Sequence, residues 1–455
     1  AELNAQQLAA VSAPPGPALV LAGAGAGKTR TLTYRVAYLL EQGIPVDRIL
    51  LLTFTNKAAR EMMDRVQNLI GGDTAGLWGG TFHSVGHRVL RRHAEAVGYP
   101  QSFTIMDRDD AKALMSAAID DAGIDTKAVR FPKPDLVCDI LSMSLNTGLP
   151  LDQVMEERYS YFDTLTDEIA QAHAAYTKRK VANGVMDFDD LLGNAVRLLR
   201  EHPEVLADHR RRFEHVLVDE YQDTNQVQND LVMLLGSAHR NVCVVGDSDQ
   251  SIYRFRRADI ALYLKARRSL PATLVALTEN FRTTIEVIDW INAVFGCLIE
   301  AGDGQPEYVP LVGRRAAASI GSSVTLLGAS AHSDLRADEL RSMEAADVAA
   351  AVTTAVAAGW TVEDANGDER SCTFADIAVL IPSRTSLTDL EDAFDHADIP
   401  YRAESSSLLF GTAEVRDLLM VLRAIDDPFD DLTIIHALRT PYLGCGDDDL
   451  ARWRI

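Results

Sequence analysis

The residues most able to do chemistry form a short glycine-rich loop, Ala22-Gly-Ala-Gly-Ala-Gly-Lys-Thr29, between an apolar segment and a segment with helical periodicity. In that context glycines let backbone N–H groups close around phosphates at the N-terminus of a helix. Lys28 is then expected to neutralise the β- and γ-phosphates, and Thr29 to place its hydroxyl on Mg²⁺. A strict version of the pattern has glycine where Ala22 stands. The alternative, a flexible Gly/Ala turn, leaves Gly-Lys-Thr at this junction unexplained.

Two adjacent carboxylates end a second apolar segment, His215-Val-Leu-Val-Asp-Glu220. Ligand sites of open α/β sheets lie at the carboxyl ends of the strands. Asp219 is expected to hold Mg²⁺ through water, and Glu220 to polarise the attacking water. An Asp–Glu pair alone is often a solvated strand end. Together with the glycine-rich loop it predicts a nucleoside triphosphatase.

These residues need a parallel sheet to bring them together. Short apolar runs typical of buried parallel strands cover residues 17–22, 49–53, 215–219 and 241–246. Segments with helical periodicity follow them at residues 28–41, 56–70 and 225–236. This alternation predicts an α/β fold with a doubly wound parallel sheet, as in P-loop nucleotide-binding proteins.

The pattern changes twice along the chain. Helical periodicity alone runs through residues 107–207, which we interpret as a helical insertion. A second α/β pattern follows, with strands expected at 273–277, 323–327 and 376–381, and helices at 336–358, 383–396 and 447–453. The predicted domains are residues 1–106 with 208–272, the insertion 107–207, a second α/β domain 273–425, and the start of a second helical insertion at 426–455.

Composition sets limits on the function. Acidic residues (66) outnumber basic ones (44), giving a formal net charge of −22, whereas nucleic-acid-binding proteins are usually basic. Net charge does not exclude a local basic groove. The five cysteines show no CxxC pairing, and the start of the chain lacks the positive charge of a signal peptide. The most apolar stretch, residues 349–360, is too short to span a bilayer. We expect a cytoplasmic protein with no membrane partner.

The segment Asp219-Glu-Tyr-Gln-Asp-Thr-Asn225 is more specific than a pair of carboxylates. It resembles motif II of superfamily 1 DNA helicases of the UvrD/Rep/PcrA group. Further segments match that family in order: Leu3-Asn-Ala-Gln-Gln7, Thr53-Phe-Thr-Asn-Lys-Ala-Ala59, Thr81-Phe-His-Ser84, Asp187-Phe-Asp-Asp190, Val245-Gly-Asp-Ser-Asp-Gln-Ser-Ile-Tyr253 and Glu279-Asn-Phe-Arg282. The resemblance implies two RecA-like domains, each with a helical insertion.

For ATP, the resemblance implies that Gln7 reads the adenine and that Gln250 and Arg282 reach the γ-phosphate. Phe281 stands where the family usually has Tyr, and its ring can still stack on adenine. The full nucleotide-binding set is Gln7, Ala22, Gly23, Ala24, Gly25, Ala26, Gly27, Lys28, Thr29, Arg30, Arg35 and Phe281. The catalytic set is Lys28, Asp219, Glu220, Gln250 and Arg282, with Thr29 and Asp219 as the Mg²⁺ ligands.

For DNA, the resemblance implies aromatic platforms for bases and polar groups for the backbone. Phe255 stands where the family usually has Trp, and Arg257 where it usually has Gly. Core packing is the alternative for Phe54 and Phe188. The expected DNA-binding residues are Phe54, Thr55, Asn56, Thr81, His83, Phe188, Tyr253, Arg254, Phe255 and Arg256.

The implied activity is ATP-dependent 3′→5′ translocation on single-stranded DNA, with unwinding of 3′-tailed duplex DNA in repair or replication restart. Two later family motifs, Thr-x-His-x-x-Lys-Gly and Val-Ala-x-Thr-Arg, are not found in the sequence. We therefore expect an incomplete motor that needs a protein partner or a missing C-terminal segment. The alternatives are a motor subunit of a RecB/AddA-like helicase–nuclease and a non-catalytic ATP- and DNA-binding fragment.

Overall fold

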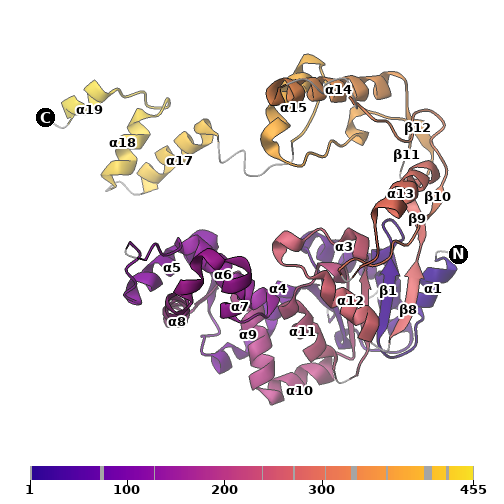
Figure 1. Ribbon diagram of the computed structural model, residues 1–455, viewed down its shortest axis with the longest axis horizontal. Helices are drawn as coiled ribbons and strands as arrows, with labels where there is room; N and C mark the ends of the chain where they lie inside the picture. Colours follow the sequence, from indigo (N-terminus) through magenta and orange to yellow (C-terminus); the bar gives the residue numbers. More distant parts are fainter. Residues whose placement is uncertain are drawn as a thin grey trace. The chain divides into compact units, whose positions relative to one another are not determined.

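The computed structural model describes residues 3–71, 76–127, 129–237, 239–269, 272–302, 304–328, 336–364, 367–403, 412–426 and 430–453. The chain divides into two compact units, Ala1–Ala317 and Ala318–Ile455. Figure 1 traces both from the N-terminus in indigo to the C-terminus in yellow.

A six-stranded parallel sheet forms the centre of the first unit. Its strands are β1 (Ala18–Ala22), β2 (Ile49–Thr53), β3 (Trp78–Thr81), β6 (His215–Val218), β7 (Val242–Gly246) and β8 (Thr273–Leu277), in the order β3-β2-β6-β7-β1-β8. The predicted α/β fold class with a parallel sheet is confirmed. The four strands predicted for this domain form within one residue of their expected bounds.

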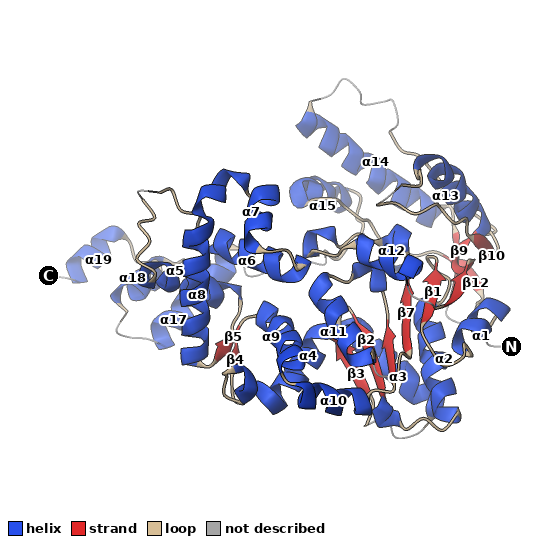
Figure 2. Cartoon of the chain, turned by 60° about the horizontal axis from the view of Figure 1, so that its bottom comes forward, coloured by secondary structure: helices blue, strands red, loops and turns tan. Residues whose placement is uncertain are grey.

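Helices cover both faces of this sheet (Figure 2). Alternate residues of a strand point to opposite faces, so Ile49 and Leu51 join one core while Leu50 and Leu52 join the other. The first face packs against α1 (Ala5–Val11), α2 (Lys28–Glu41) and α3 (Asn56–Ile70). The second packs against α4 (Phe82–His93), α9 (Phe188–Glu201) and α11 (Gln226–Gly236). Burial on both faces explains why β2 is apolar throughout.

The predicted helical insertion is helical, with a core of its own around Met115, Ile140 and Ile169. Its helices are α5 (Arg108–Asp121), α6 (Pro134–Thr147), α7 (Leu151–Arg158) and α8 (Thr166–Asn183). The short strands β4 (Thr104–Ile105) and β5 (Val185–Met186) pair in parallel beside it. Helices α9 and α10 (Pro203–Arg212) contribute their buried side chains to the core of the sheet instead.

Strand β8 differs from the expected domain organisation. Residues 273–277 were expected to open the second α/β domain, but β8 pairs with β1 from Ala18↔Thr273 to Ala22↔Leu277. It therefore completes the first sheet. An apolar run predicts a strand but not its neighbour, because ladder hydrogen bonds join backbone atoms and do not depend on side-chain type.

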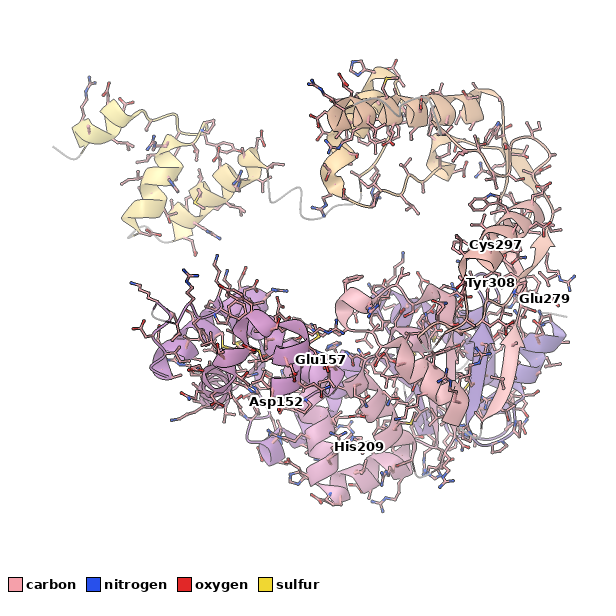
Figure 3. The ribbon with its side chains drawn as sticks, viewed as in Figure 1. Asp152, Glu157, His209, Glu279, Cys297 and Tyr308 are labelled. Carbon is pink, nitrogen blue, oxygen red and sulfur yellow. The ribbon has the colours of Figure 1, made fainter. Side chains whose placement is uncertain are left out.

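After β8 the first unit ends in a small subassembly that carries family motif residues. Helix α12 (Ile260–Ser269) precedes it, and strands β9 (Glu279–Thr284) and β10 (Val312–Arg315) pair in parallel around α13 (Ile285–Leu298). Glu279 of β9 forms a 3.0 Å ion pair with Arg314 of β10, and the Tyr308 hydroxyl donates to Asn292 Oδ1 of α13 at 2.8 Å; Figure 3 labels Glu279 and Tyr308. The ion pair joins the two strands, and the hydrogen bond joins α13 to the segment that leads into β10.

The second unit is mainly helical. Helices α14 (Ala337–Ala357) and α15 (Leu387–His396) share a small core that includes Ala349 and Phe394. The hairpin β11 (Thr361–Glu363)–β12 (Glu369–Ser371) lies between them in sequence, and α17 (Ala413–Asp426), α18 (Asp431–Arg439) and α19 (Asp447–Trp453) follow. The helices predicted at 336–358 and 447–453 are confirmed.

Two predicted strands of the second unit are not formed. Residues 323–327 and 376–381 are described and belong to no strand. A strand persists only where a neighbour takes up its backbone hydrogen bonds. In the described part of this unit, strand pairing is confined to β11 with β12. Among the helices that the structure describes, none is long and apolar enough to cross a bilayer.

Candidate active site

The expected nucleotide-binding residues meet at the carboxyl edge of the sheet. Strands β6, β7 and β1 are adjacent, so the loops that follow them emerge side by side. The glycine-rich loop follows β1, Asp219 and Glu220 follow β6, and Gln250 follows β7. Sheet topology therefore assembles three segments that are far apart in sequence.

The glycine-rich loop has the backbone shape that phosphate binding requires. Gly25 has a φ of +67°, and a Cβ there would lie 2.6 Å from Asn280 Nδ2, so only glycine fits. Ala22, the departure from the strict pattern, is the last residue of β1 and is buried in the core. Its methyl group therefore fills core space rather than the loop, which explains why alanine is tolerated.

Lys28 pairs with one of the two expected catalytic carboxylates. Its Nζ lies 2.9 Å from Glu220 Oε2, although the geometry is that of an ion pair and not of a hydrogen bond. Lys28 is buried, so the ammonium lies in an environment where charges interact strongly. A phosphate group entering the loop would find a desolvated cation with unused hydrogen-bond donors.

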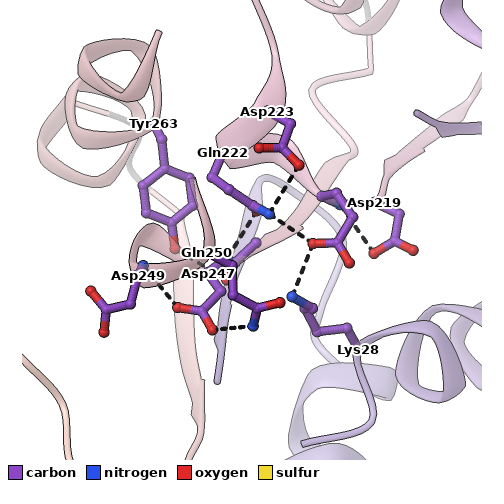
Figure 4. Close-up of polar contacts among 10 residues, drawn as sticks. Lys28, Asp219, Gln222, Asp223, Asp247, Asp249, Gln250 and Tyr263 are labelled. Carbon is purple, nitrogen blue, oxygen red and sulfur yellow. Dashed lines mark hydrogen bonds and ion pairs between the residues drawn. The ribbon is translucent and has the colours of Figure 1, made fainter. Parts of the chain in front are cut away.

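A chain of hydrogen bonds continues from Glu220 across the site (Figure 4). Gln222 Nε2 donates to Glu220 Oε2 at 2.8 Å, and Gln222 Oε1 accepts from the backbone N–H of Asp247 at 2.9 Å. Gln250 Nε2 donates to Asp247 Oδ2. The buried amide of Gln222 thus connects the loop after β6 to the loop after β7 and holds Glu220 in register with Gln250.

Asp219 carries a perturbed carboxyl group. Burial, and then the neighbouring charge of Glu220, raise the pKa of Asp219 to about 7, while Lys28 and a hydrogen bond with Thr29 act in the opposite direction. The backbone N–H of Glu220 also donates to Asp219 Oδ1 at 3.1 Å. A buried carboxyl whose pKa lies near neutrality marks a functional position.

This raised pKa predicts a dependence of stability on pH. The ordinary pKa of Asp is 3.8, so between about pH 4 and pH 7 the folded chain holds a proton at Asp219 that the unfolded chain has lost. Stability is therefore expected to fall as the pH rises through this window. Melting temperatures between pH 5 and pH 8 test this, and Asp219→Asn should flatten the slope. An unchanged slope in Asp219→Asn would contradict it.

The side chains of Thr29 and Asp219 are suitable ligands for Mg²⁺. Among the described residues there is no group of three or more His, Cys, Asp or Glu side chains that could hold a metal by itself. Mg²⁺ in nucleotide sites is bound by one or two protein oxygens together with substrate phosphates. Thr29 and Asp219, which are hydrogen-bonded to each other beside the loop, supply such a pair. The residues present therefore fit the ion.

Gln7 lies against the glycine-rich loop, but Arg35 does not serve as expected. Gln7 Nε2 donates to the carbonyl of Ala26 at 3.0 Å. Arg35 Nη1 donates to the carbonyls of Ala10, Val11 and Ala13 at 2.9, 3.0 and 3.3 Å. The prediction that Arg35 contacts nucleotide is wrong. The last carbonyls of a helix lack partners, and a buried guanidinium satisfies those of α1.

Strand β9 brings its motif residues to the loop. Asn280 Nδ2 donates to the carbonyl of Ala24 at 2.7 Å, and the Phe281 N–H donates to the carbonyl of Gly25 at 3.1 Å. Asn280 Oδ1 in turn accepts from the N–H of Arg282 at 2.9 Å. The side chains of Phe281 and Arg282 are exposed beside the loop. Arg30, at the start of α2, is also exposed and lies 5.6 Å from the Tyr34 ring centroid.

The expected DNA-binding aromatics form a row on the same edge of the sheet. Phe54 follows β2 and its ring centroid lies 5.3 Å from that of Tyr253, which lies 5.7 Å from that of Phe255. Phe255 is 75% exposed. Phe54 is half-buried and its ring lies against that of Tyr253, so core packing, the alternative for this residue, does not account for the whole side chain.

A second aromatic group lies at the ends of β3 and β5. Phe188 is 58% exposed, and its ring contacts His83 edge-on at 6.4 Å. Asp187 caps the N-terminus of α9, and Asp187 and Asp190 both pair with the buried Lys180 at 2.9 and 2.7 Å. These aspartates hold the helix while Phe188 projects. Burial lowers the pKa of His83, with the charge of Asp189 opposing it.

The remaining candidates differ in how freely they can reach a ligand. Thr55 caps α3 by accepting from the N–H of Ala58, and Thr81 caps α4 in the same way from Ser84. Asn56 and Arg254 are exposed. The side chain of Arg256 lies outside the described residues. The two threonine hydroxyls are therefore already engaged in helix capping, which is a common role of threonine at the N-cap position.

Three site residues were missed as such in the sequence. Gln222, Asp247 and Asn280 lie inside the matched motifs, yet no chemistry was assigned to them. Each is buried and makes hydrogen bonds that join one loop of the site to another. The only local sign of such a role is a polar residue placed among charged motif residues. The hydrogen-bond partner lies in another loop of the site, which the sequence does not reveal.

Two protein-family profiles together cover nearly the whole chain. The profile of the UvrD/REP helicase N-terminal domain matches residues 3–271, and that of the UvrD-like helicase C-terminal domain matches residues 275–454. The chain belongs to the UvrD/REP helicase family. The C-terminal match overturns the expectation that the chain lacks the end of the family pattern.

Individual relatives agree. The chain is 33% identical over 452 residues to the ATP-dependent DNA helicase PcrA of Staphylococcus aureus, which covers 99% of this chain and 57% of that protein. It is 35% identical over 455 residues to the ATP-dependent DNA helicase UvrD1 of Mycobacterium tuberculosis, covering 98% of this chain and 55% of that protein. The chain thus spans about half the length of these UvrD/REP relatives.

Proposed function

We propose that this chain works as an ATP-driven DNA helicase motor that hydrolyses ATP and moves 3′→5′ along single-stranded DNA. The observation that carries the proposal is the meeting of Lys28, Glu220 and the Asp219–Thr29 pair at one edge of the sheet. Its substrates are ATP, single-stranded DNA and 3′-tailed duplex DNA, and its work is duplex opening in repair or replication restart. The printed activity of PcrA and UvrD1 supports this assignment.

In the proposed reaction each residue has a separate task. Lys28 and the backbone N–H groups of the loop bind the phosphates, and Glu220 orients the attacking water and accepts its proton. Gln250 and Arg282 contact the γ-phosphate, where Arg282 stabilises the charge that develops. Mg²⁺, held by Thr29 and Asp219, would neutralise charge on the β- and γ-phosphates.

The nucleotide base has its own proposed contacts. Gln7 presents an amide beside the loop for the adenine edge, Arg30 lies at the exposed start of α2, and Phe281 offers a ring face for stacking. Phe281 lacks the hydroxyl of the usual tyrosine, so only the stacking contribution is available. The base therefore adds affinity, while the phosphates carry the chemistry.

DNA is proposed to bind along the aromatic row. Phe54, Tyr253, Phe255 and Phe188 supply ring faces, with His83, Asn56 and Arg254 for the backbone. Stacking does not depend on base identity, which suits a motor that must move along any sequence. Opening a base pair costs on average about 1.4 kcal/mol. The loop after β7 carries both Gln250 and Tyr253, and β2 lies next to β6, so nucleotide-dependent shifts of these loops can move the DNA.

Steady-state ATP hydrolysis by the 455-residue chain, with and without oligo(dT), tests the proposal. We expect hydrolysis that oligo(dT) stimulates and that Lys28→Ala reduces by at least about 10²-fold, because one donor to the reacting phosphate is lost. Lys112→Ala, which changes an exposed lysine on α5, serves as the matched control. Nucleotide binding without hydrolysis in either condition would refute the proposed activity.

Loss of the exposed ring at Phe255 should weaken DNA binding without affecting nucleotide. Phe255→Ala is expected to cost about 1–3 kcal/mol of oligo(dT) affinity, the usual value of one base–aromatic stack. Fluorescence anisotropy with labelled oligo(dT) measures it. The control is Tyr161→Ala, which removes a ring of similar exposure, 74%, from the helical insertion. Equal losses in the two variants would argue against a stacking role for Phe255.

A further inference from the structure

Helix α6 of the helical insertion connects the nucleotide edge to the aromatic residues proposed to bind DNA. Asn225 ends the motif segment 219–225 and caps α11, and its Nδ2 donates to Asn146 Oδ1 of α6 at 2.8 Å. Asn146 Nδ2 in turn donates to Asp189 Oδ1 at 2.8 Å. Asp189 is the neighbour of Phe188, and its charge acts to raise the pKa of His83 against the larger effect of burial. Three residues from three helices thus form one hydrogen-bonded chain.

The hydrogen-bonded series Asn225–Asn146–Asp189 has little freedom to rearrange. Asn146 and Asn225 are buried, and Asn146 Nδ2 is also held by the carbonyl and hydroxyl of Ser142 at 2.9 and 3.2 Å. A buried amide that loses its partner cannot exchange it for water, so displacement of one member is costly unless the others follow.

The backbone fit next to Asn146 is equally close. Gly148 has a φ of +70°, and a Cβ there would lie 2.9 Å from Gln226 Cγ, so the end of α6 rests directly on the start of α11. A second bond reaches α6 from the aromatic row, because Arg257 Nη2 donates to the carbonyl of Asp139 at 2.8 Å. Arg257 has a φ of +65°, a backbone conformation that glycine adopts more readily than arginine.

Nucleotide binding acts on the other end of the same segment. Glu220 pairs with Lys28, and a phosphate in the loop would compete with Glu220 for that ammonium. Only the short 3₁₀ turn Tyr221–Asp223 and Thr224 separate Glu220 from Asn225. A movement of Glu220 therefore occurs only five residues from Asn225, which caps α11 and is hydrogen-bonded to Asn146.

We infer that Asn146 is a positioning residue that couples the nucleotide site to the DNA contact at Phe188. It touches neither ligand and acts through Asn225 on one side and Asp189 on the other. The inference rests on the proposed function, because it requires that both ligands bind. It assigns a role in the motor to a residue of the helical insertion that lies outside every matched motif.

Thermodynamic linkage tests this without requiring turnover. The dissociation constant of labelled oligo(dT) is measured on the 455-residue chain with and without a non-hydrolysable ATP analogue and Mg²⁺. The ratio of the two constants is expected to differ from one by on the order of 5–150-fold. Asn146→Ala should bring the ratio toward one, while oligo(dT) affinity without nucleotide stays near the wild-type value. Asn183→Ala, which removes an exposed Asn side chain bonded to a helix carbonyl, is the control.

A paired exchange separates coupling from simple structural damage. Asn146→Asp places two carboxylates against each other and should bring the ratio of dissociation constants to one. The double variant Asn146→Asp with Asp189→Asn restores a donor and an acceptor and should return the ratio to the wild-type value. Asp189→Asn alone is the reference. A wild-type ratio in Asn146→Asp overturns the inference, as does a ratio of one in a wild-type chain that binds both ligands. A wild-type chain that binds neither ligand refutes the proposed function instead.

Discussion

Replacing Arg282 by alanine should lower ATP turnover by roughly 10³–10⁵-fold, the usual loss when an arginine finger is removed. Its backbone is fixed beside the glycine-rich loop, because Asn280 bonds both to the Ala24 carbonyl and to the Arg282 N–H. The exposed guanidinium is then free to reach the γ-phosphate from the open side. Since the charge that it stabilises develops during the reaction, the loss should appear in kcat more than in nucleotide affinity.

Stopped-flow or steady-state phosphate release measures this effect, with binding of a fluorescent ATP analogue as the second readout. Arg314→Ala is the matched control, because Arg314 is an exposed arginine on the neighbouring strand β10 that pairs with Glu279. Arg282→Lys should recover only part of the rate, since lysine keeps the charge but not the planar fork of donors. Turnover of Arg282→Ala within a few-fold of wild type would rule out the finger role.

Glu220→Gln should reduce kcat by about 10²–10⁴-fold while ATP still binds, because the amide cannot accept the proton of the attacking water. The variant keeps the size of the side chain and the capacity to accept from Gln222 Nε2. It removes the ion pair with Lys28, which leaves the ammonium free for phosphate, so nucleotide affinity should be unchanged or higher.

The same substitution has a second consequence. Because the charge of Glu220 contributes to the raised pKa of Asp219, its removal should lower that pKa and shift the pH-dependent loss of stability to lower pH. Glu214→Gln is the control, since Glu214 precedes β6 at the opposite end and pairs with Arg48 at 2.8 Å. If Glu220→Gln hydrolyses ATP at the wild-type rate, another group must activate the water, and the geometry offers Asp223 and Asp247 as the next carboxylates to test.

Much of the local structure of the first unit follows from the sequence. Helices α2 and α3 have the predicted bounds, because each begins at a capping or loop signal and keeps a 3.6-residue apolar period. The strand β2 is apolar throughout because both of its faces are buried. The glycine-rich loop and the Asp219–Glu220 pair were located by residue type alone, since phosphate and Mg²⁺ accept few kinds of partner. The roles assigned to the site residues stay predictions for the experiments above.

The errors share a physical origin. Arg35 was assigned to nucleotide because the family resemblance implied it, but its guanidinium satisfies the carbonyls at the end of α1. The strands expected at 323–327 and 376–381 have apolar runs as β2 has, yet belong to no strand. In each case the outcome depends on whether backbone groups of a distant segment are within hydrogen-bond reach. Every residue type carries these groups, so the sequence does not show where they lie.

The sequence by itself determined the kind of each element in the sheet domain and the chemistry at its edge, because periodicity and residue type are local properties. Tertiary structure alone decided that β8 closes the first sheet, that Gln222 joins Glu220 to Asp247, and that Asn146 lies between Asn225 and Asp189. The bonds from Gln222 to Asp247 and from Asn146 to Asp189 and Asn225 join residues 25, 43 and 79 positions apart. Which distant groups meet depends on how the cores pack, and a polar side chain carries no mark of the partner that packing brings to it.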